Sequence, residues 1–143
     1  MLNSFYYGED NLTVAKVFSL AEGTLKGTIS PAAQEKIRAS QQHVTDIVSS
    51  RKTVYGINTG FGILANTRIS EEDTQTLQHK ILQSHSVGVG DPVPPEIAKM
   101  MMIAKVHALA QGYSGVLLET LHRICWHITE DVIPVVQIGR AHV

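Results

Sequence analysis

The sequence TVYGINTGFG, residues 53–62, changes character halfway along its length. Its first part is rich in β-branched and aromatic residues, which favour an extended backbone. Its second part contains Gly56, Gly60 and Gly62, and glycine adopts backbone conformations that other residues avoid. We therefore expect one or two short extended segments near residues 52–58, leading into a loop that these three glycines shape.

Apolar residues at helical spacing dominate the rest of the chain. Helices are expected where such a run follows a start signal, such as Thr13 before the first run and Ser30–Pro31 before the second. The short turn at Gly112–Gly115 predicts that the last two helices are antiparallel neighbours. The chain is therefore predicted to be mainly α, with helices at about residues 13–22, 31–50, 71–87, 95–111 and 115–128.

The same spacing predicts which helical faces point inward. The predicted stripes comprise Val14, Val17, Phe18 and Ala21 in the first helix, Leu77, Ile81 and His85 in the third, and Ile97, Met101, Ala104 and Ala108 in the fourth. Ser114 is expected to cap the last helix, which carries Leu121 and Ile128. The last two helices are apolar on more than one side, as helices within a larger bundle are.

Composition excludes several classes of function. Of the 143 residues, 43% are hydrophobic and 17% charged, and the net charge is −1, so no basic patch for nucleic acid is expected. No apolar run approaches the ~20 residues of a membrane span, and no HExxH or Cys/His cluster predicts a metal site. The single cysteine, Cys125, indicates a reducing compartment, and a cytoplasmic protein is expected.

Tyr55 and His85 each allow two interpretations from spacing alone. Tyr55 is either a packed tyrosine at the end of a strand or a phenol held by a glycine-rich loop close to a ligand. A phenol normally loses its proton near pKa ~10, so a base at neutral pH would need a lowered pKa. His85 is either a core histidine or a ring that lines a pocket and offers one hydrogen bond to a ligand.

Four stretches in order resolve this choice by resemblance: Tyr55–Gly62 (YGINTGFG), Leu82–Gly90 (LQSHSVGVG), Ala108–Gly115 (ALAQGYSG) and Val132–Val136 (VIPVV). They are similar to the aromatic amino acid ammonia-lyases, and the resemblance covers about residues 11–136, the N-terminal quarter of such an enzyme. It implies the N-terminal part of the helical fold that these lyases share with fumarase-like enzymes.

The resemblance also implies site residues and chemistry. Tyr55 matches the tyrosine that acts on the β-carbon proton of the substrate, and Ser84–His85 resembles the selectivity pair of the histidine-specific members. L-histidine is then the implied substrate, trans-urocanate and ammonia the products, and a homotetramer the assembly. The resemblance implies no metal and no dissociable cofactor. It implies instead a methylidene-imidazolone group that forms from an internal Ala-Ser-Gly.

The sequence departs from the family after residue 136. The family continues into a segment with Ala-Ser-Gly, and that tripeptide occurs nowhere in these 143 residues. We therefore expect the chain alone to be inactive, with an N-terminal substrate-loop domain at residues 1–112, the first part of a central helical bundle at residues 113–137 and a non-native tail at residues 138–143. The alternatives are an aminomutase of the same architecture and a non-catalytic helical module that self-associates through exposed apolar faces.

Overall fold

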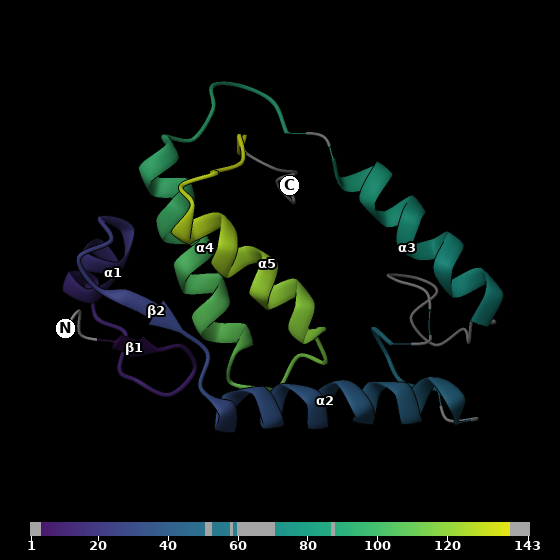
Figure 1. Ribbon diagram of the computed structural model, residues 1–143. Helices are drawn as coiled ribbons and strands as arrows, with labels where there is room; N and C mark the ends of the chain where they lie inside the picture. Colours follow the sequence, from purple (N-terminus) through teal and green to yellow (C-terminus); the bar gives the residue numbers. More distant parts are fainter. Residues whose placement is uncertain (1–3, 51–52, 58, 60–70, 87, 138–143) are drawn as a thin grey trace. The chain divides into compact units, whose positions relative to one another are not determined.

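The computed structural model describes residues 4–50, 53–57, 59, 71–86 and 88–137 (Figure 1). This part of the chain is mainly helical, as predicted. In order it contains β1 (Ser4–Tyr6), α1 (Val14–Ala21), β2 (Lys26–Thr28), α2 (Pro31–Ser49), α3 (Glu71–His85), α4 (Pro95–Leu109) and α5 (Leu118–Thr129).

The chain divides into two compact units. The first comprises Met1–Gln42 and Pro92–Val136, and the second comprises His43–Asp91 and Gln137–Val143. The predicted boundary between residues 112 and 113 concerns the longer family architecture and stays a prediction. The predicted tail, residues 138–143, lies outside the described residues.

The helix starts follow the predicted signals. The Thr13 hydroxyl accepts a hydrogen bond from the Lys16 amide at 3.3 Å, so Thr13 is the N-cap of α1. The Ser30 hydroxyl accepts one from the Ala33 amide at 3.0 Å at the start of α2. Pro95 opens α4, where its missing N–H costs nothing. The predicted cap Ser114 is wrong, because α5 begins later, with Leu117 as its N-cap residue.

The strands are not where the sequence predicted them. β1 and β2 pair in parallel, with Phe5 opposite Gly27. Within residues 53–57 no strand forms, because Tyr55–Ile57 is a turn in which the Ile57 amide donates to the Val54 carbonyl at 3.2 Å. The predicted extended segment is wrong there because Gly56 has φ +77°, a left-handed conformation that ends any strand.

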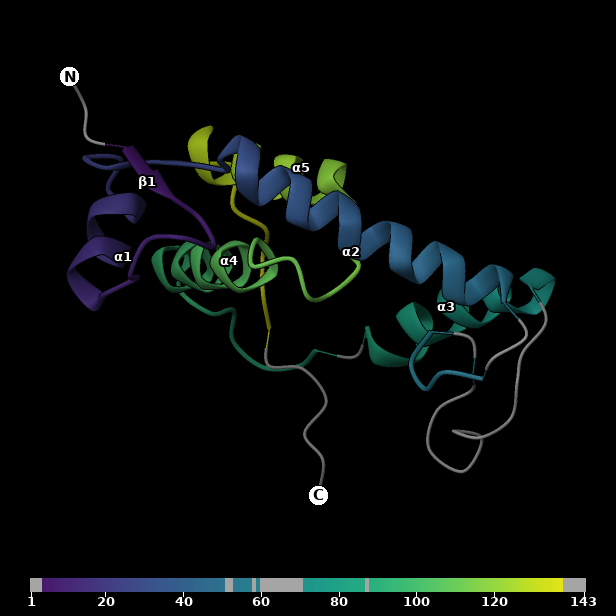
Figure 2. The same cartoon turned by 90° about the horizontal axis from the view of Figure 1, so that it is seen from below.

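The core of the first unit lies between α1, α4 and α5. The two views agree that α4 lies next to both α1 and α5, and α5 runs back along α4 as predicted (Figures 1 and 2). Phe5 and Tyr7 add two buried rings from β1 and the residue after it, with centroids 5.5 Å apart. The fully buried aliphatic residues between the helices include Leu20, Ile37, Ile103, Val106 and Leu121.

Two predicted faces differ from the observed ones. In α1 the buried residue is Leu20, and Val14 is 75% exposed. In α4 the core takes Ala98, Ile103 and Val106, which leaves the predicted stripe of Ile97, Met101, Ala104 and Ala108 exposed. The physical reason is that α4 has apolar residues on more than one side, so spacing alone could not select the face that packs on α1 and α5.

Candidate functional site

Tyr55 lies in the second unit, in a turn after α2. Its side chain is 64% exposed. The next residue, Gly56, has φ +77°, and its amide donates to the Thr59 hydroxyl at 3.3 Å. Thr59 itself is buried, so it anchors the turn. This arrangement holds the phenol of Tyr55 outward on a glycine turn, while Gly60 and Gly62 lie outside the described residues.

Ser84 and His85 occupy the last turn of α3, in the same compact unit as Tyr55. The Ser84 hydroxyl donates to the Ile81 carbonyl at 3.1 Å and lies 2.9 Å from Nδ1 of His85. Nδ1 of His85 is also 2.9 Å from the Ile81 carbonyl oxygen. The two predicted substrate-binding side chains are therefore joined to each other and to one backbone carbonyl.

These contacts assign the tautomer of the neutral His85 ring. A carbonyl oxygen only accepts, so Nδ1 carries the proton that points to Ile81. The Ser84 hydroxyl gives its one proton to the same carbonyl and can accept from Nδ1. The other ring nitrogen, Nε2, then has a lone pair and no partner among the described residues, so it can accept a hydrogen bond from a ligand.

The prediction that His85 points inward is wrong for this structure. Leu77 and Ile81 are half-buried on α3, as the stripe predicted, but His85 and Ser84 are exposed. The hydrogen bonds to the Ile81 carbonyl explain this, because they fold both side chains back over the last turn of their own helix. An exposed ring at a helix end is accessible to a ligand or to another segment.

The described residues show neither a cluster of metal ligands nor an activated thiol. No group of three His, Cys, Asp or Glu side chains among them is placed to hold a metal ion. No helix among them is both long and apolar enough to cross a membrane. Burial raises the pKa of the Cys125 thiol to about 11, so this cysteine is a poor nucleophile at neutral pH.

The comparisons with known proteins agree with the motif pattern. The profile of the aromatic amino acid lyases matches residues 12–139. The chain belongs to this family. Among curated family members, histidine ammonia-lyase from Caldanaerobacter subterraneus subsp. tengcongensis is 41% identical over 127 residues, 89% of this chain and 25% of that protein. Histidine ammonia-lyase from Psychromonas ingrahamii is 38% identical over 125 residues, 87% of this chain and 24% of that protein.

Solved structures of aromatic amino acid lyases and related enzymes share the fold. Histidine ammonia-lyase from Trypanosoma cruzi superimposes with a TM-score of 0.77 at 35% identity, over 88% of this chain and 25% of its own. Tyrosine aminomutase from Streptomyces globisporus gives a TM-score of 0.80 at 25% identity, over 92% and 24%. This chain thus spans about a quarter of the length of the relatives it matches.

Sequence reasoning missed two polar groups of the chain that the structure singles out. The first is Tyr7, buried beside Gly27. The second is Asp131, which has φ +56° and accepts a hydrogen bond from Lys99 at 2.7 Å. Phe5 and Tyr7 are spaced as two inward-facing residues of a strand are, and this was the available signal for Tyr7. Three residues are too few, however, to predict a strand. No local signal marks the pairing of Asp131 with a residue 32 positions away.

Proposed function

We propose that this chain is the N-terminal part of a histidine ammonia-lyase, which eliminates ammonia from L-histidine to give trans-urocanate. The observation that carries the proposal is the Ser84–His85 pair, whose hydrogen bonds leave Nε2 of His85 as an acceptor. An imidazole N–H of a bound histidine is a donor of the matching kind. The curated relatives that match the chain at 37–41% identity carry the same activity in their names.

Tyr55 is the proposed base for the β-carbon proton of the substrate. Its exposure on a turn that contains Gly56 suits a group that must reach a bound molecule. Proton transfer from carbon requires the phenolate, so positive groups or hydrogen bonds in the complete enzyme must stabilise that form. We further propose that Gly56, Gly60 and Gly62 shape the loop that carries Tyr55.

His85 and Ser84 are the proposed substrate-positioning residues. The lone pair on Nε2 of His85 would orient the substrate ring, while the Ile81 carbonyl, to which Ser84 also donates, fixes the tautomer of His85. A helix end is a more rigid platform than a loop. The proposed base is therefore a phenol on a turn, and the proposed substrate-positioning group is an imidazole at the end of a helix.

The family's methylidene-imidazolone does not fit within these residues. The 143 residues contain no Ala-Ser-Gly, so they lack the atoms from which the ring is made. No step is therefore assigned to that group, and we propose that these residues are inactive without the remainder of the enzyme. The homotetramer and the cytoplasmic location stay predictions of the resemblance and of the composition.

An aminomutase of the same architecture is the second candidate function. The likeness to the tyrosine aminomutase of Streptomyces globisporus, at a TM-score of 0.80, favours this possibility at the level of fold. Sequence identity favours the histidine-specific lyase, since the Trypanosoma cruzi enzyme is 35% identical and the aminomutase 25%. Product analysis separates the two, because an aminomutase yields a β-amino acid.

The proposed function is tested with a chimera. Residues 1–137 of this chain replace the matched N-terminal quarter of the histidine ammonia-lyase of Caldanaerobacter subterraneus, with the unmodified relative as the control. We expect the chimera to release urocanate from histidine, measured by its ultraviolet absorbance, and the isolated chain to release none. A folded chimera that leaves histidine unchanged, or steady turnover by the isolated chain, would contradict the proposal.

A further inference from the structure

The first unit contains a hollow of about 1060 Å³ that none of Tyr55, Ser84 or His85 lines. Its walls come from α1, the turn after it, β2, the start of α4 and the end of α5. The lining is mixed: charged residues stand beside apolar ones, which include Phe18, Leu20, Leu25, Met100, Ile128 and Ile133. Its size is at the upper end of the range for sites that hold small organic molecules, about 300–1,000 Å³.

The hydroxyl of Tyr7 lies at the wall of this hollow. Tyr7 is 2% exposed, and its ring packs against Gly27, where a Cβ would approach the Tyr7 oxygen to 2.4 Å. Both residues line the hollow. The hydroxyl makes no hydrogen bond to any described residue, although every fully enclosed side-chain N or O atom among those residues has a partner. The Tyr7 oxygen is therefore not fully enclosed, and the space that it faces is the hollow.

The Tyr7 hydroxyl is a hydrogen-bond donor at neutral pH. Burial raises the pKa of the Tyr7 phenol well above its usual value, and the nearby Cys125 thiol acts in the same direction. No described residue accepts a hydrogen bond from this hydroxyl, so an acceptor that enters the hollow can pair with it in place of water.

Lys99 is a second donor at the same hollow. Its side chain is 13% exposed, and its ammonium donates to the Asp131 carboxylate at 2.7 Å. An ammonium has three N–H groups, and no other bond from this one is found among the described residues. Tyr7 and Lys99 thus present, at one hollow, O–H and N–H groups from which no described residue accepts a hydrogen bond.

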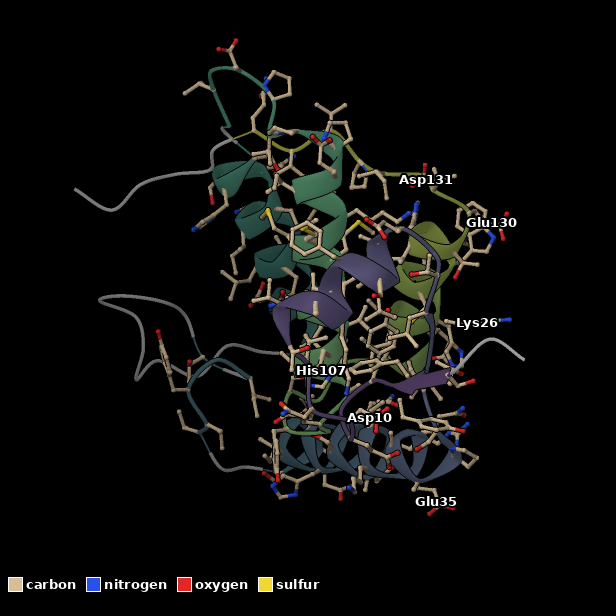
Figure 3. The ribbon with its side chains drawn as sticks, turned by 90° about the vertical axis from the view of Figure 1, so that its left-hand side faces the viewer. Asp10, Lys26, Glu35, His107, Glu130 and Asp131 are labelled. Carbon is tan, nitrogen blue, oxygen red and sulfur yellow. The ribbon has the colours of Figure 1, made fainter. Side chains whose placement is uncertain are left out.

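The remaining charged groups limit the charge of a ligand. Glu22 and Glu96 are exposed at the rim, together with the Asp131 carboxylate. Lys26 also lines the hollow, but its side chain reaches away from the ribbon (Figure 3). The three carboxylates outnumber Lys26 and Lys99, so they oppose doubly charged phosphate more strongly than a single carboxylate, which would share Lys99 with Asp131.

We propose that this hollow binds a small monocarboxylate with an apolar body, whose oxygens accept hydrogen bonds from the Tyr7 hydroxyl and the Lys99 ammonium. The apolar body would cover Leu20, Ile128 and the exposed ring of Phe18. This site is separate from the proposed catalytic residues and does not depend on the proposed function.

The test titrates the full chain with 3-phenylpropionate, with the neutral 3-phenylpropanamide and with inorganic phosphate, followed by calorimetry and by amide NMR shifts. We expect 3-phenylpropionate to bind with a dissociation constant below about 1 mM and to move the amide resonances of Gly23 and Gly27. Phosphate should leave both resonances in place. Absence of 3-phenylpropionate binding, which would mean that water alone fills the hollow, overturns the proposal.

Two variants assign the contacts. Tyr7→Phe keeps the ring and removes a hydroxyl without a partner among the described residues, so the fold should persist. The acid 3-phenylpropionate and the amide 3-phenylpropanamide should both bind to this variant about three- to tenfold more weakly. Lys99→Met keeps an apolar stem and should weaken the acid about tenfold or more but the amide by less than about twofold.

The matched control for these variants is Tyr6→Phe, at the position before Tyr7, where the side chain is 42% exposed and not part of the lining. It should bind all three probes as the unmodified chain does. Circular dichroism verifies the fold of each variant. Equal affinity of Tyr7→Phe and the unmodified chain for 3-phenylpropionate, or equal losses of acid and amide in Lys99→Met, overturns the proposed contacts.

Discussion

At the scale of single residues, His85 is the group that we expect to select the substrate. Replacing it with Leu in the chimera removes the Nε2 acceptor and should lower kcat/KM for histidine about tenfold or more, since one hydrogen bond to a ligand is lost. The same variant should turn over phenylalanine better than the unmodified chimera does. Because the ring is exposed, the fold should persist. Unchanged selectivity between the two substrates would remove His85 from the site.

His107 is a second histidine with a defined task, at the end of α4. Its Nδ1 accepts a hydrogen bond from the Gly8 amide at 3.2 Å, and its ring lies 5.7 Å from that of Phe5. Gly8 has φ +82°, and a Cβ there would meet the Ala110 carbonyl. Burial lowers the pKa of His107, and Asp10, on the segment after Gly8, partly opposes this effect (Figure 3). The neutral ring thus holds the N-terminal segment on α4.

This lowered pKa predicts a loss of stability in acid. The unfolded chain takes up the proton near pH 6.5, before the folded chain does, so the contribution is present above about pH 6.5 and is lost as the pH falls. Urea unfolding at about pH 7.5 and about pH 5.5 measures it. In His107→Asn, whose carbonyl can replace Nδ1 but does not titrate, the decrease should be smaller. Equal decreases in both proteins would contradict this role.

At the scale of elements, the end of α5 shows how one residue closes a helix. The Val132 amide donates to the His127 carbonyl at 3.0 Å, and Asp131 between the helix and Val132 has φ +56°. This is the position that glycine usually takes after a helix. Asp tolerates it better than most residues do, and the ion pair with Lys99 adds a tertiary contact.

The backbone of Asp131 can be tested apart from its carboxylate. Asp131→Gly and Asp131→Ala both remove the ion pair, but only Ala keeps a Cβ in the left-handed conformation. We expect Asp131→Ala to unfold with about 1 kcal/mol less free energy than Asp131→Gly, measured by urea denaturation. Equal stabilities would show that the conformation of this residue costs nothing.

The elements also show what the sequence could predict. Short-range signals were sufficient at Thr13 and Ser30, because a cap depends on atoms three residues away. Spacing failed for α4, whose buried residues such as Ile103 follow from packing on α1 and α5. It also failed for β1, whose three residues depend on a partner strand 22 positions later in the chain.

The sequence also predicts only part of the candidate site. Motif resemblance predicts Tyr55 and His85 as site residues, and this stays a prediction. The hydrogen bonds that turn His85 back over its helix depend on side-chain rotamers that the spacing of α3 does not predict. The donors of Tyr7 and Lys99 meet at one hollow only because α1, β2, α4 and α5 pack around it. Such long-range juxtapositions carry no local sequence signal.

At the scale of the whole molecule, the chain spans about a quarter of its relatives and exposes apolar residues. Ile97 and Met101 on α4 are 44% and 51% exposed, and Trp126 on α5 is 44% exposed. Single exposed apolar residues are normal, but a stripe along a helix is typical of a surface that another segment or molecule covers. The alternative of a self-associating module rests on this surface, whereas the proposed catalytic residue Tyr55 lies in the second unit.

The most direct measurement compares the rate of urocanate formation from histidine by the chimera with the rate by its Tyr55→Phe variant. The side chain is 64% exposed, so removing its oxygen should leave the fold intact, as circular dichroism would verify. We predict a loss of kcat of about 100-fold or more, the contribution of a general base. A folded Tyr55→Phe chimera that turns over histidine at the unmodified rate would contradict the central claim.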